Sequence, residues 1–375
     1  MSTTSVPVNP VVSQVIPLTR TRHAAVTRNV PADPRLIDSF GRVATDLRVS
    51  LTDKCNLRCQ YCMPAEGIDP LPNQMLLSDD EINRLIRIGV ELLGIEEVRF
   101  TGGEPLLRKG LEGIVEKTAA LRTWTGKKPD ISLTTNGLGL KHRAGRLKAA
   151  GLDRVNLSMD TASRETYAAM TRRDRFDDAR AGARAAADAG LTPVKVNAVL
   201  MPGINDTDAP NLLLESLVSG YSLRFIEYMP LGPRGQWHRE EIITADDILG
   251  MLSESFTLTP RPAAERGAAP AELWDVTAGE VLGTRHPGGT VGIIGSVTRP
   301  FCGNCDRTRL TADGQIRDCL FANTETDLRG GLRGGASDEE IADMWRDAMW
   351  GKLAGHGTDN PAFLNPTRPM SAIGG

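Results

Sequence analysis

No apolar run in the 375-residue sequence is long enough to cross a membrane, and neither sign of charge dominates. The 44 Lys and Arg against 47 Asp and Glu give a formal net charge of −3, which provides no overall attraction to nucleic acid or to a membrane. The motif Gly-x4-Gly-Lys-[Ser/Thr] is also missing, because Gly126-Lys127 and Gly351-Lys352 both lack the leading glycine and the following hydroxyl residue. Nucleotide binding through a P-loop is therefore excluded.

Cysteine is scarce too, and its six residues fall into two triplets with none left over. The triplets are Cys55-x3-Cys59-x2-Cys62 and Cys302-x2-Cys305-x13-Cys319. Disulfide-stabilised secreted domains are shorter and richer in cysteine, so we expect reduced, metal-bound thiols and a cytoplasmic location. Three thiolates are one fewer than the four that complete a 4Fe–4S cluster or a tetrahedral zinc site. Each triplet therefore predicts a metal centre with one open coordination position.

The first triplet gathers three soft ligands within eight residues, as an iron–sulfur cluster requires. Zinc, or one disulfide with a spare thiol, is the alternative for the same residues. Zinc sites favour Cys-x2-Cys pairs, and none of the five histidines lies near this loop to supply a fourth ligand. The spacing therefore favours an open 4Fe–4S cluster, as a hypothesis that the surrounding sequence must support.

From about residue 45 the sequence alternates short apolar runs with helical stretches, which predicts repeated βα units and a parallel sheet. Six strands are expected, at residues 47–51, 97–101, 131–135, 154–158, 193–199 and 223–228. Ser78 with Glu81 and Ser337 with Glu340 form capping boxes, which predict two helix starts. Six units are too few for a complete eight-stranded barrel. We therefore predict an α/β fold, a partial (β/α)6 TIM-type barrel that a C-terminal α+β extension closes.

The predicted organisation along the chain has four parts. Residues 1–40 are rich in Ser, Thr, Val and Pro, and their prolines disfavour the amphipathic helix of a transit peptide, so a disordered extension is expected. The other parts are the partial barrel with the first cluster (41–245), a region with the second cluster (246–365) and a flexible Gly-Gly tail (366–375). Within the third part, residues 260–272 are expected to form a linker or surface loop.

Polar residues gather where the predicted strands end. In parallel barrels the loops after the carboxyl ends of the strands build the active site. The first cysteine loop follows the first strand, and residues 101–105, 134–137 and 158–160 follow the next three. Lys195 lies within the fifth strand, and Arg224, Glu227 and Met229 lie on or just past the sixth. We expect these residues to face one cavity.

The first cysteine loop followed by Gly102-Gly103-Glu104-Pro105 resembles the signature of radical S-adenosylmethionine (SAM) enzymes. The resemblance implies that SAM chelates the fourth iron of the first 4Fe–4S cluster and that an electron from the cluster releases a 5′-deoxyadenosyl radical. It also implies contacts to SAM from Tyr61, Gly103, Ser158 and Met229.

The second triplet, with Arg307-Thr308-Arg309 after Cys305, resembles the GTP 3′,8-cyclase family, which is also called molybdenum cofactor biosynthesis protein A. The resemblance runs from about Asp46 to the C-terminus. It implies that the open iron of a second 4Fe–4S cluster binds the purine of GTP, and that hydrogen abstraction from ribose C3′ leads to (8S)-3′,8-cyclo-7,8-dihydroguanosine 5′-triphosphate. GTP contacts are then expected from Arg48, Arg99, Thr134, Lys195, Arg307, Thr308 and Arg309.

Further roles follow from the same resemblance. Arg224 is the candidate catalytic residue, and Gly374 and Gly375 match a tail that enters the site. Asp306 departs from the family pattern and is expected to pair with Arg307 or Arg309. The implied partners are an external electron donor, a downstream cyclic pyranopterin monophosphate synthase and a second copy in a homodimer. The alternatives are a radical SAM peptide maturase with an auxiliary cluster and a non-catalytic zinc-binding protein.

Overall fold

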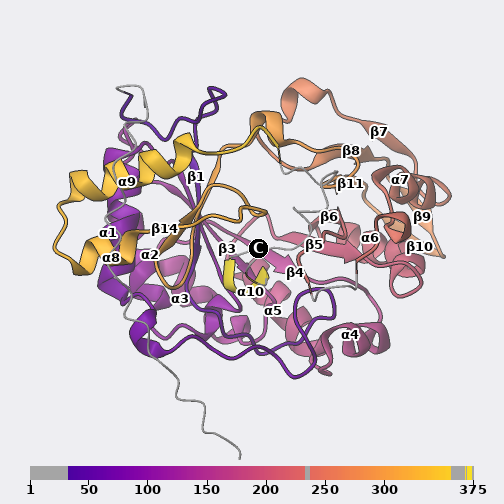
Figure 1. The fold of residues 1–375 in the computed structure, drawn as a ribbon. Helices are drawn as coiled ribbons and strands as arrows, with labels where there is room; N and C mark the ends of the chain where they lie inside the picture. Colours follow the sequence, from indigo (N-terminus) through magenta and orange to yellow (C-terminus); the bar gives the residue numbers. More distant parts are fainter. Residues whose placement is uncertain (1–32, 233–236, 356–367, 369, 374–375) are drawn as a thin grey trace, which may run out of the picture.

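The computed structural model describes residues 33–232, 237–355, 368 and 370–373. Most of the predicted N-terminal extension, as well as Gly374 and Gly375, lies outside the described residues. One twelve-stranded sheet passes through the molecule in the order β14-β13-β12-β1-β2-β3-β4-β5-β6-β11-β8-β7, and β9 and β10 form a separate pair (Figure 1). No helix within the described ranges is long and apolar enough to cross a membrane.

Six parallel strands form the centre of the sheet. They are β1 (Asp46–Ser50), β2 (Glu97–Thr101), β3 (Asp130–Thr135), β4 (Arg154–Ser158), β5 (Lys195–Leu200) and β6 (Ser222–Glu227). Each pairs with the next along the chain, as repeated βα units require. All six predicted strands are confirmed, with ends displaced by no more than two residues.

The C-terminal part of the chain adds strands to both edges of this sheet. Strand β11 (Gly289–Ile294) pairs in parallel with β6, and β12 (Arg307–Leu310) pairs in parallel with β1. Antiparallel strands complete the edges: β7 (Leu258–Pro260) and β8 (Glu272–Val276) beyond β11, and β13 (Gln315–Arg317) and β14 (Thr326–Asp327) beyond β12. The remaining hairpin is β9 (Gly279–Val281) and β10 (Thr284–His286).

The partial barrel is thus confirmed, but strand pairing does not close it within the described residues. The extension instead lengthens the sheet at both ends. Residues 295–306, which contain Cys302 and Cys305, connect β11 at one edge to β12 at the other.

Helices cover the outer face of the sheet (Figure 1). They are α1 (Asp79–Arg87), α2 (Leu111–Ala120), α3 (Ala144–Ala149), α4 (Arg164–Thr171), α5 (Phe176–Asp188), α6 (Ala209–Val218), α7 (Ala245–Ser253), α8 (Leu328–Arg333) and α9 (Asp338–Trp350), whereas α10 (Met370–Ile373) lies inside the partial barrel. A π-helical turn, η2 (Ile88–Leu92), continues α1, and 3-10 turns occur at η1 (Asn73–Met75), η3 (Pro105–Leu107), η4 (Leu140–His142), η5 (Asp206–Asp208), η6 (Arg239–Glu241), η7 (Ala263–Glu265) and η8 (Cys302–Asn304). Both predicted capping boxes are present, at α1 and α9.

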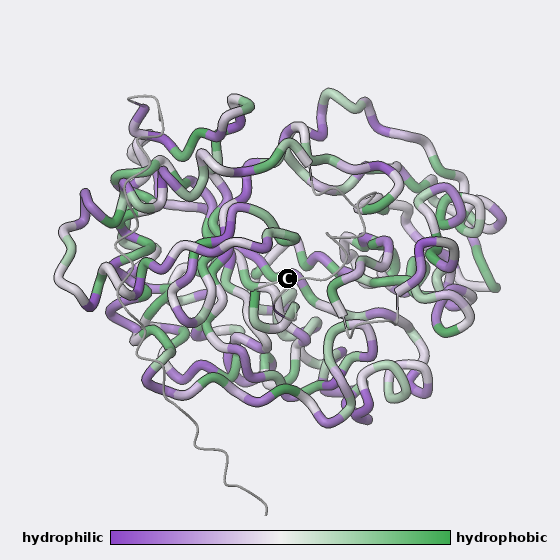
Figure 2. Tube along the Cα trace, viewed as in Figure 1, coloured by the Kyte–Doolittle hydropathy of each residue, from purple (hydrophilic) through white to green (hydrophobic). Residues whose placement is uncertain are grey.

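The central strands carry different residues on their two faces because successive side chains of a strand point in opposite directions. Val98 and Phe100 of β2 are fully buried against the helices, and Leu47 and Val49 of β1 belong to the same core. Arg48 lies between Leu47 and Val49 in sequence and therefore points to the opposite face of the sheet. Hydrophilic and hydrophobic residues both occur along the central strands (Figure 2). The inner face of the partial barrel is therefore polar.

Candidate active site

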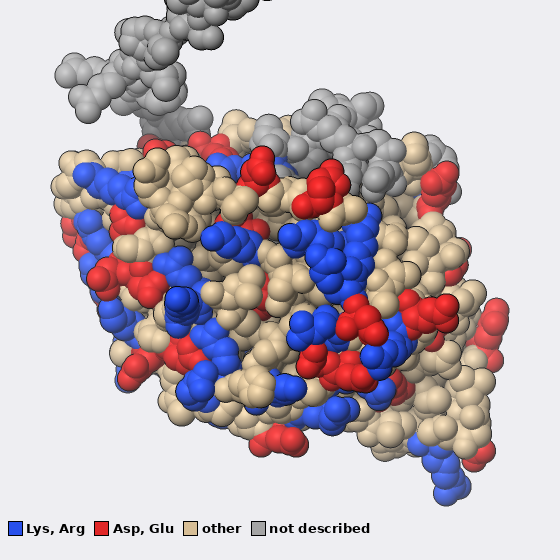
Figure 3. Space-filling model, turned by 90° about the horizontal axis from the view of Figure 1, so that it is seen from below, with Lys and Arg blue, Asp and Glu red and all other residues tan. Residues whose placement is uncertain are grey.

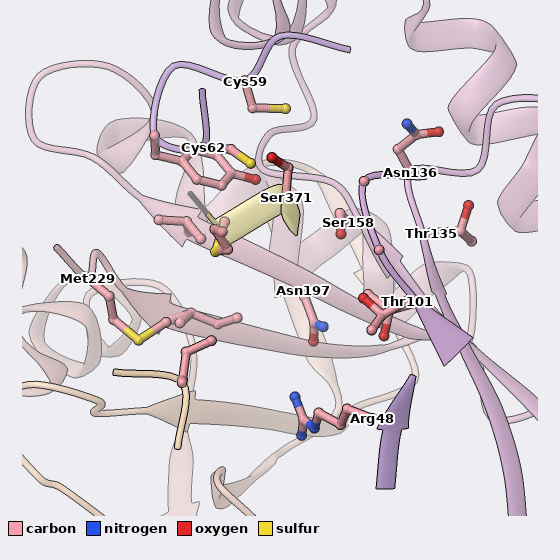
Figure 4. A pocket seen from close by; sticks show the side chains of 18 of the residues that line it. Arg48, Cys59, Cys62, Thr101, Thr135, Asn136, Ser158, Asn197, Met229 and Ser371 are labelled. Atoms are coloured by element: carbon pink, nitrogen blue, oxygen red, sulfur yellow. The ribbon is translucent and has the colours of Figure 1, made fainter. Parts of the chain in front are cut away.

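A cavity of about 250 Å³ lies at the carboxyl ends of the central strands. Most of the predicted site residues line it: Arg48, Cys55, Cys59, Tyr61, Cys62, Arg99, Gly103, Thr134, Ser158, Arg224, Met229, Arg307 and Arg309. Figure 4 shows Cys59 and Cys62 at one end of this cavity and Arg48 at the other, with Ser158 and Asn197 between them. The expectation that the strand ends face one cavity is thus met by residues from all six central strands.

The first cysteine triplet forms a compact loop after β1. The backbone N–H groups of Cys62 and Met63 both donate to the carbonyl of Cys59, at 3.0 and 3.1 Å, and the N–H of Leu57 lies 3.4 Å from the Cys55 sulfur. Burial raises the pKa of Cys55 and Cys59, and raises that of Cys62 to about 12. Bare thiols would therefore stay protonated here, whereas bound iron supplies the positive charge that stabilises thiolates.

The two glycines after β2 allow the next loop to lie against the start of the cysteine loop. Gly102 has a φ of +139°, and a Cβ there would come within 2.4 Å of the carbonyl oxygen of Thr52. A Cβ at Gly103 would come within 2.3 Å of the carbonyl oxygen of Lys54. Any side chain at either position would push the two loops apart.

Glu104 connects the loops that follow β2 and β3. Its buried carboxylate accepts hydrogen bonds from the backbone of Leu106 at 2.9 Å, the hydroxyl of Thr135 at 2.7 Å and the backbone of Asn136 at 2.8 Å. Burial raises the pKa of Glu104 to about 7 although these bonds oppose the rise. The carboxylate also lines the cavity.

A second buried carboxyl, that of Asp160, holds the tyrosine of the cysteine loop. The Tyr61 hydroxyl donates to it at 3.0 Å, and the backbone N–H of Val199 donates to its other oxygen at 2.9 Å. Burial raises the pKa of Asp160 to about 6. The sequence placed Asp160 in a rim loop, but no motif distinguished it from the neighbouring Ser158.

Four arginines meet on the inner face of β1, β2 and β12. Arg48 lies beside Arg99 in the register of β1 and β2 and beside Arg309 in that of β1 and β12, and Arg307 lies opposite Asp46. Asp46, which sequence reasoning did not select, is buried 3.6 Å from Arg48 and 3.7 Å from Arg99. Asp46 and Arg48 are two residues apart on β1 and so share its inner face, and this spacing could have identified Asp46 from the sequence.

This arginine cluster is poorly compensated by the protein itself. Burial and the neighbouring guanidinium of Arg99 lower the pKa of Arg48 well below its usual value. The buried Nε atoms of Arg48, Arg99 and Arg224 have no hydrogen-bond partner in the described part of the chain. Unsatisfied guanidinium groups that converge on a cavity fit an anion that binds bidentately, as phosphates do. On the outer surface shown in Figure 3, by contrast, acidic and basic side chains are interspersed.

Arg224 and Lys195 lie on the same inner face, from β6 and β5. Arg224 donates to the side-chain oxygen of Asn156 at 2.7 Å, and burial together with Arg99 and Arg154 lowers its pKa to about 9. Lys195 is not in the cavity wall but lies opposite Asn156 in the strand register. Burial lowers the pKa of Lys195 to about 8.

Two expected cavity residues point away from it. Thr308 lies between Arg307 and Arg309, so strand alternation directs its side chain to α9, where its hydroxyl accepts a 3.0 Å hydrogen bond from the Trp345 indole. The expectation that Glu227 faces the cavity is wrong for the same reason. Its buried carboxylate accepts hydrogen bonds from the backbone N–H groups of Ala245, Val297 and Thr298.

The second cysteine triplet lies beside the same cavity. Phe301, Arg307 and Leu320, which flank the cysteines in sequence, line the cavity, although the three cysteines themselves are outside its wall. Burial raises the pKa of Cys319, and the nearby Arg309 opposes this rise. The expected pairing of Asp306 is found with Arg307, at 3.6 Å.

Neither triplet is arranged around a single ion. No group of three His, Cys, Asp or Glu side chains in the described ranges is placed to hold one metal ion. A 4Fe–4S cluster instead takes each thiolate on a different iron, and the donor set of three sulfurs beside a cavity fits such a cluster.

The described C-terminal residues, which precede Gly374 and Gly375, lie in the cavity. Met370 and Ser371 of α10 line it, and the Ser371 backbone N–H donates to the Cys62 sulfur. Figure 4 shows Ser371 beside Cys62. Arg368 anchors this segment through Asp313, at 2.9 and 3.0 Å, and Glu325, at 2.7 Å. The burial of α10 explains why this part of the tail is ordered.

The linker expected at residues 260–272 also contributes to the site. The carbonyl of Ala268 accepts a 2.6 Å hydrogen bond from Arg307, and Pro270 lines the cavity. The composition of this segment predicted a surface loop and gave no sign of these contacts.

Comparisons with known proteins agree with this geometry. The Radical SAM superfamily model matches residues 49–215, and the Molybdenum Cofactor Synthesis C model matches residues 221–358. The GTP 3′,8-cyclase of Streptomyces coelicolor is 62% identical over 340 residues, which are 91% of this chain and 96% of that protein. The GTP 3′,8-cyclase of Mycobacterium marinum is 56% identical over 356 residues, covering 95% of this chain and 96% of the relative.

Solved structures share the fold at much lower identity. Streptococcus suis SuiB bound to S-adenosylmethionine has a TM-score of 0.55 at 13% identity, covering 86% of this chain and 70% of that chain. This likeness shows the fold alone.

Proposed function

Because the chain belongs to the radical SAM superfamily and, within it, to the GTP 3′,8-cyclase family, we infer that it converts GTP to (8S)-3′,8-cyclo-7,8-dihydroguanosine 5′-triphosphate. This is the first step of molybdenum cofactor biosynthesis. The observation that carries the inference is the single cavity with the first cysteine triplet at one end and the arginine cluster beside the second triplet at the other.

The cofactors are two 4Fe–4S clusters and SAM. We propose that Cys55, Cys59 and Cys62 hold the first cluster, and that Cys302, Cys305 and Cys319 hold the second. The first cluster supplies the electron that cleaves SAM, and the resulting 5′-deoxyadenosyl radical takes the ribose C3′ hydrogen of GTP.

We propose that the residues near the first triplet hold SAM. Tyr61, Gly103, Ser158 and Met229 all line the cavity close to the cysteine loop or at the ends of β4 and β6. Gly103 lets the backbone of its loop approach the cysteine loop, and the bond from Tyr61 to Asp160 fixes the tyrosine ring. These contacts would place SAM at the end of the cavity opposite the arginine cluster.

We propose that the inner arginines bind the triphosphate. Arg48, Arg99, Arg307 and Arg309 offer guanidinium groups, and a triphosphate would supply the negative charge that Asp46, shared between Arg48 and Arg99, does not fully balance. Lys195 and Thr134 complete this set from β5 and β3. Thr308 can contribute only through its backbone, because its hydroxyl already bonds to Trp345 on the other face of the strand.

Arg224 is the proposed catalytic residue. Its bond to Asn156 holds the guanidinium at the inner wall of the cavity, where it would contact the nucleotide. A radical is quenched by any accessible hydrogen donor, so the walls must also exclude water.

The remaining partners are proposals that rest on the family. We propose an external electron donor, a downstream cyclic pyranopterin monophosphate synthase that consumes the product, a homodimer and a cytoplasmic location. A reducing compartment would suit clusters that are open to a ligand.

The proposal is tested by incubating the anaerobically reconstituted protein with SAM, reductant and GTP and identifying the nucleotide product by mass spectrometry. We expect the cyclised nucleotide and 5′-deoxyadenosine together. The Cys59→Ala variant should form neither, because it removes a ligand of the first cluster. SAM cleavage that persists in this variant would refute the assignment of the first site.

A further inference from the structure

Lys352, just past the end of α9, is a buried lysine whose ammonium group meets the second cysteine triplet. Lys352 is only 3% exposed. The Nζ atom lies 3.4 Å from the Cys305 sulfur, 3.2 Å from the Cys305 carbonyl oxygen and 2.9 Å from the Arg307 carbonyl oxygen. All three ammonium hydrogens therefore have an acceptor on the segment that carries Cys305.

The protein gives this buried charge no close carboxylate. Within the described ranges, no Asp or Glu oxygen lies within 4.0 Å of Lys352; burial raises the pKa of the more distant Asp318, and the charge of Lys352 only opposes this rise. A buried ammonium is unfavourable unless a negative charge compensates it. The nearest atom that can carry such a charge is the Cys305 sulfur, as a thiolate.

We propose that Lys352 is a positioning residue for the second cluster, which donates an N–H···S hydrogen bond to Cys305 and raises the reduction potential of that cluster. The inference rests on the proposed function, because it requires a cluster at the second triplet. Reduction adds a negative charge to the cluster, and a nearby cation stabilises the reduced form more than the oxidised form. Hydrogen bonds to the ligand sulfurs and the surrounding charge are known to set iron–sulfur potentials.

The contacts fix the ammonium in place. The two carbonyl acceptors leave it little freedom to turn away from the sulfur, so its effect on the cluster is constant rather than averaged over conformers. Arg42 holds the neighbouring cysteine by donating to the Cys302 carbonyl at 2.7 Å, and Asp38 compensates its charge. Lys352 is thus the uncompensated cation of the pair.

In the described part of the chain, no Lys or Arg side chain donates a hydrogen bond to a sulfur of the first triplet; the donors there are neutral groups such as the backbone N–H of Leu57. Arg58 reaches the carbonyls of Cys55 and Leu57 rather than a sulfur, and the charged groups closest to the other two cysteines include the carboxyl of Asp160. A change at Lys352 should therefore act on the second cluster alone.

The test is a redox titration of the second cluster, followed by electron paramagnetic resonance. It uses the full chain with Cys55, Cys59 and Cys62 replaced by Ala, so that only the second cluster remains, with about four irons expected. In this background Lys352→Leu should shift the midpoint potential to a more negative value, and Lys352→Arg should keep it close to the parent. Lys127→Met, at an exposed lysine between α2 and β3, should cause no shift.

Lys352→Gln separates charge from hydrogen bonding. The Gln side chain keeps a hydrogen-bond donor but has no charge, so the midpoint potential of the second cluster should be lower in this variant than in Lys352→Arg. This comparison remains possible if Lys352→Leu fails to retain iron. Equal potentials in the Gln and Arg variants, or an unchanged potential in a fully loaded Leu variant, would overturn the inference. A parent protein that binds iron only at the first triplet would instead refute the proposed second cluster.

Discussion

Arg307, Thr308 and Arg309 are consecutive on β12, yet they contribute to different parts of the molecule. The two arginines point into the cavity, whereas Thr308 is fully buried on the opposite face beneath α9. A sequence motif treats the three residues as one unit, but the two-residue period of a strand separates them. Substitutions at neighbouring positions should therefore affect different properties.

Thr308→Val should lower stability without changing GTP binding. The substitution leaves the buried indole N–H of Trp345 without its acceptor, which costs about 1–3 kcal/mol of unfolding free energy. Arg309→Gln should weaken GTP binding about tenfold or more, because a charge-assisted phosphate contact is worth about 1.5–3 kcal/mol. Thermal unfolding and equilibrium binding measure the two effects. A loss of GTP affinity in Thr308→Val equal to that in Arg309→Gln would contradict this division.

GTP binding should weaken as the pH rises above about 8. Burial lowers the pKa of Lys195 to about 8 in the free protein, so the side chain loses its charge above this pH. A bound triphosphate favours the charged form and raises that pKa, so binding takes up a proton and the Kd rises by up to about tenfold per pH unit. Calorimetry between pH 7 and pH 9.5 measures this.

Lys195→Arg provides the control for this pH dependence. The guanidinium at this position keeps its charge, so the profile of the variant should be flat up to the pKa of about 9 that burial gives Arg224. A Kd of the parent protein that does not change between pH 7 and pH 9.5 would exclude Lys195 from the phosphate site.

At the scale of elements, Glu227 joins three segments that are distant in sequence. It ends β6, caps the start of α7 through the N–H of Ala245 at 2.7 Å, and accepts from Val297 at 2.7 Å and Thr298 at 2.9 Å. The last two residues begin the connection that carries Cys302 and Cys305 from β11 to β12. Glu227 therefore positions the second triplet without facing the cavity.

Glu227→Ala should destabilise the protein and loosen the second cluster. Removing the carboxylate leaves three backbone N–H groups unpaired, which costs about 3 kcal/mol or more. We expect iron loss from the second triplet while the first keeps its cluster, measured by iron content and electron paramagnetic resonance. Glu254→Ala, at an exposed position after α7, should stay within about 0.5 kcal/mol of the parent. Equal iron loss from both triplets would contradict the local role.

At the scale of the whole molecule, local signals were sufficient for the framework. The six strands follow from apolar runs, and the capping boxes at Ser78 and Ser337 fix helix starts within four residues of sequence. The cysteine spacing and the order of the loops after the strands predicted most of the residues that line the cavity. These features depend on contacts between residues that are close along the chain or on the regular order of parallel strands.

The features that sequence reasoning missed depend on contacts between distant segments. Lys352 meets Cys305 only because α9 packs across β12, and α10 reaches Cys62 only because Arg368 binds Asp313. Asp46 becomes important once β1, β2 and β12 align their arginines around it. No local pattern encodes such long-range register, so the place of Asp46, the contact of Lys352 with Cys305 and the anchoring of α10 by Arg368 required the structure.

The central claim is that one cavity holds SAM at the first triplet and GTP at the arginine cluster, so that the ribose C3′ hydrogen lies within reach of the radical. The most direct test is turnover of GTP carrying deuterium at C3′, under anaerobic conditions with SAM and reductant, followed by mass spectrometry of the 5′-deoxyadenosine. The account predicts that one deuterium moves into the 5′-deoxyadenosine while the cyclised nucleotide accumulates. Unlabelled 5′-deoxyadenosine, with the deuterium still on the nucleotide, would contradict it.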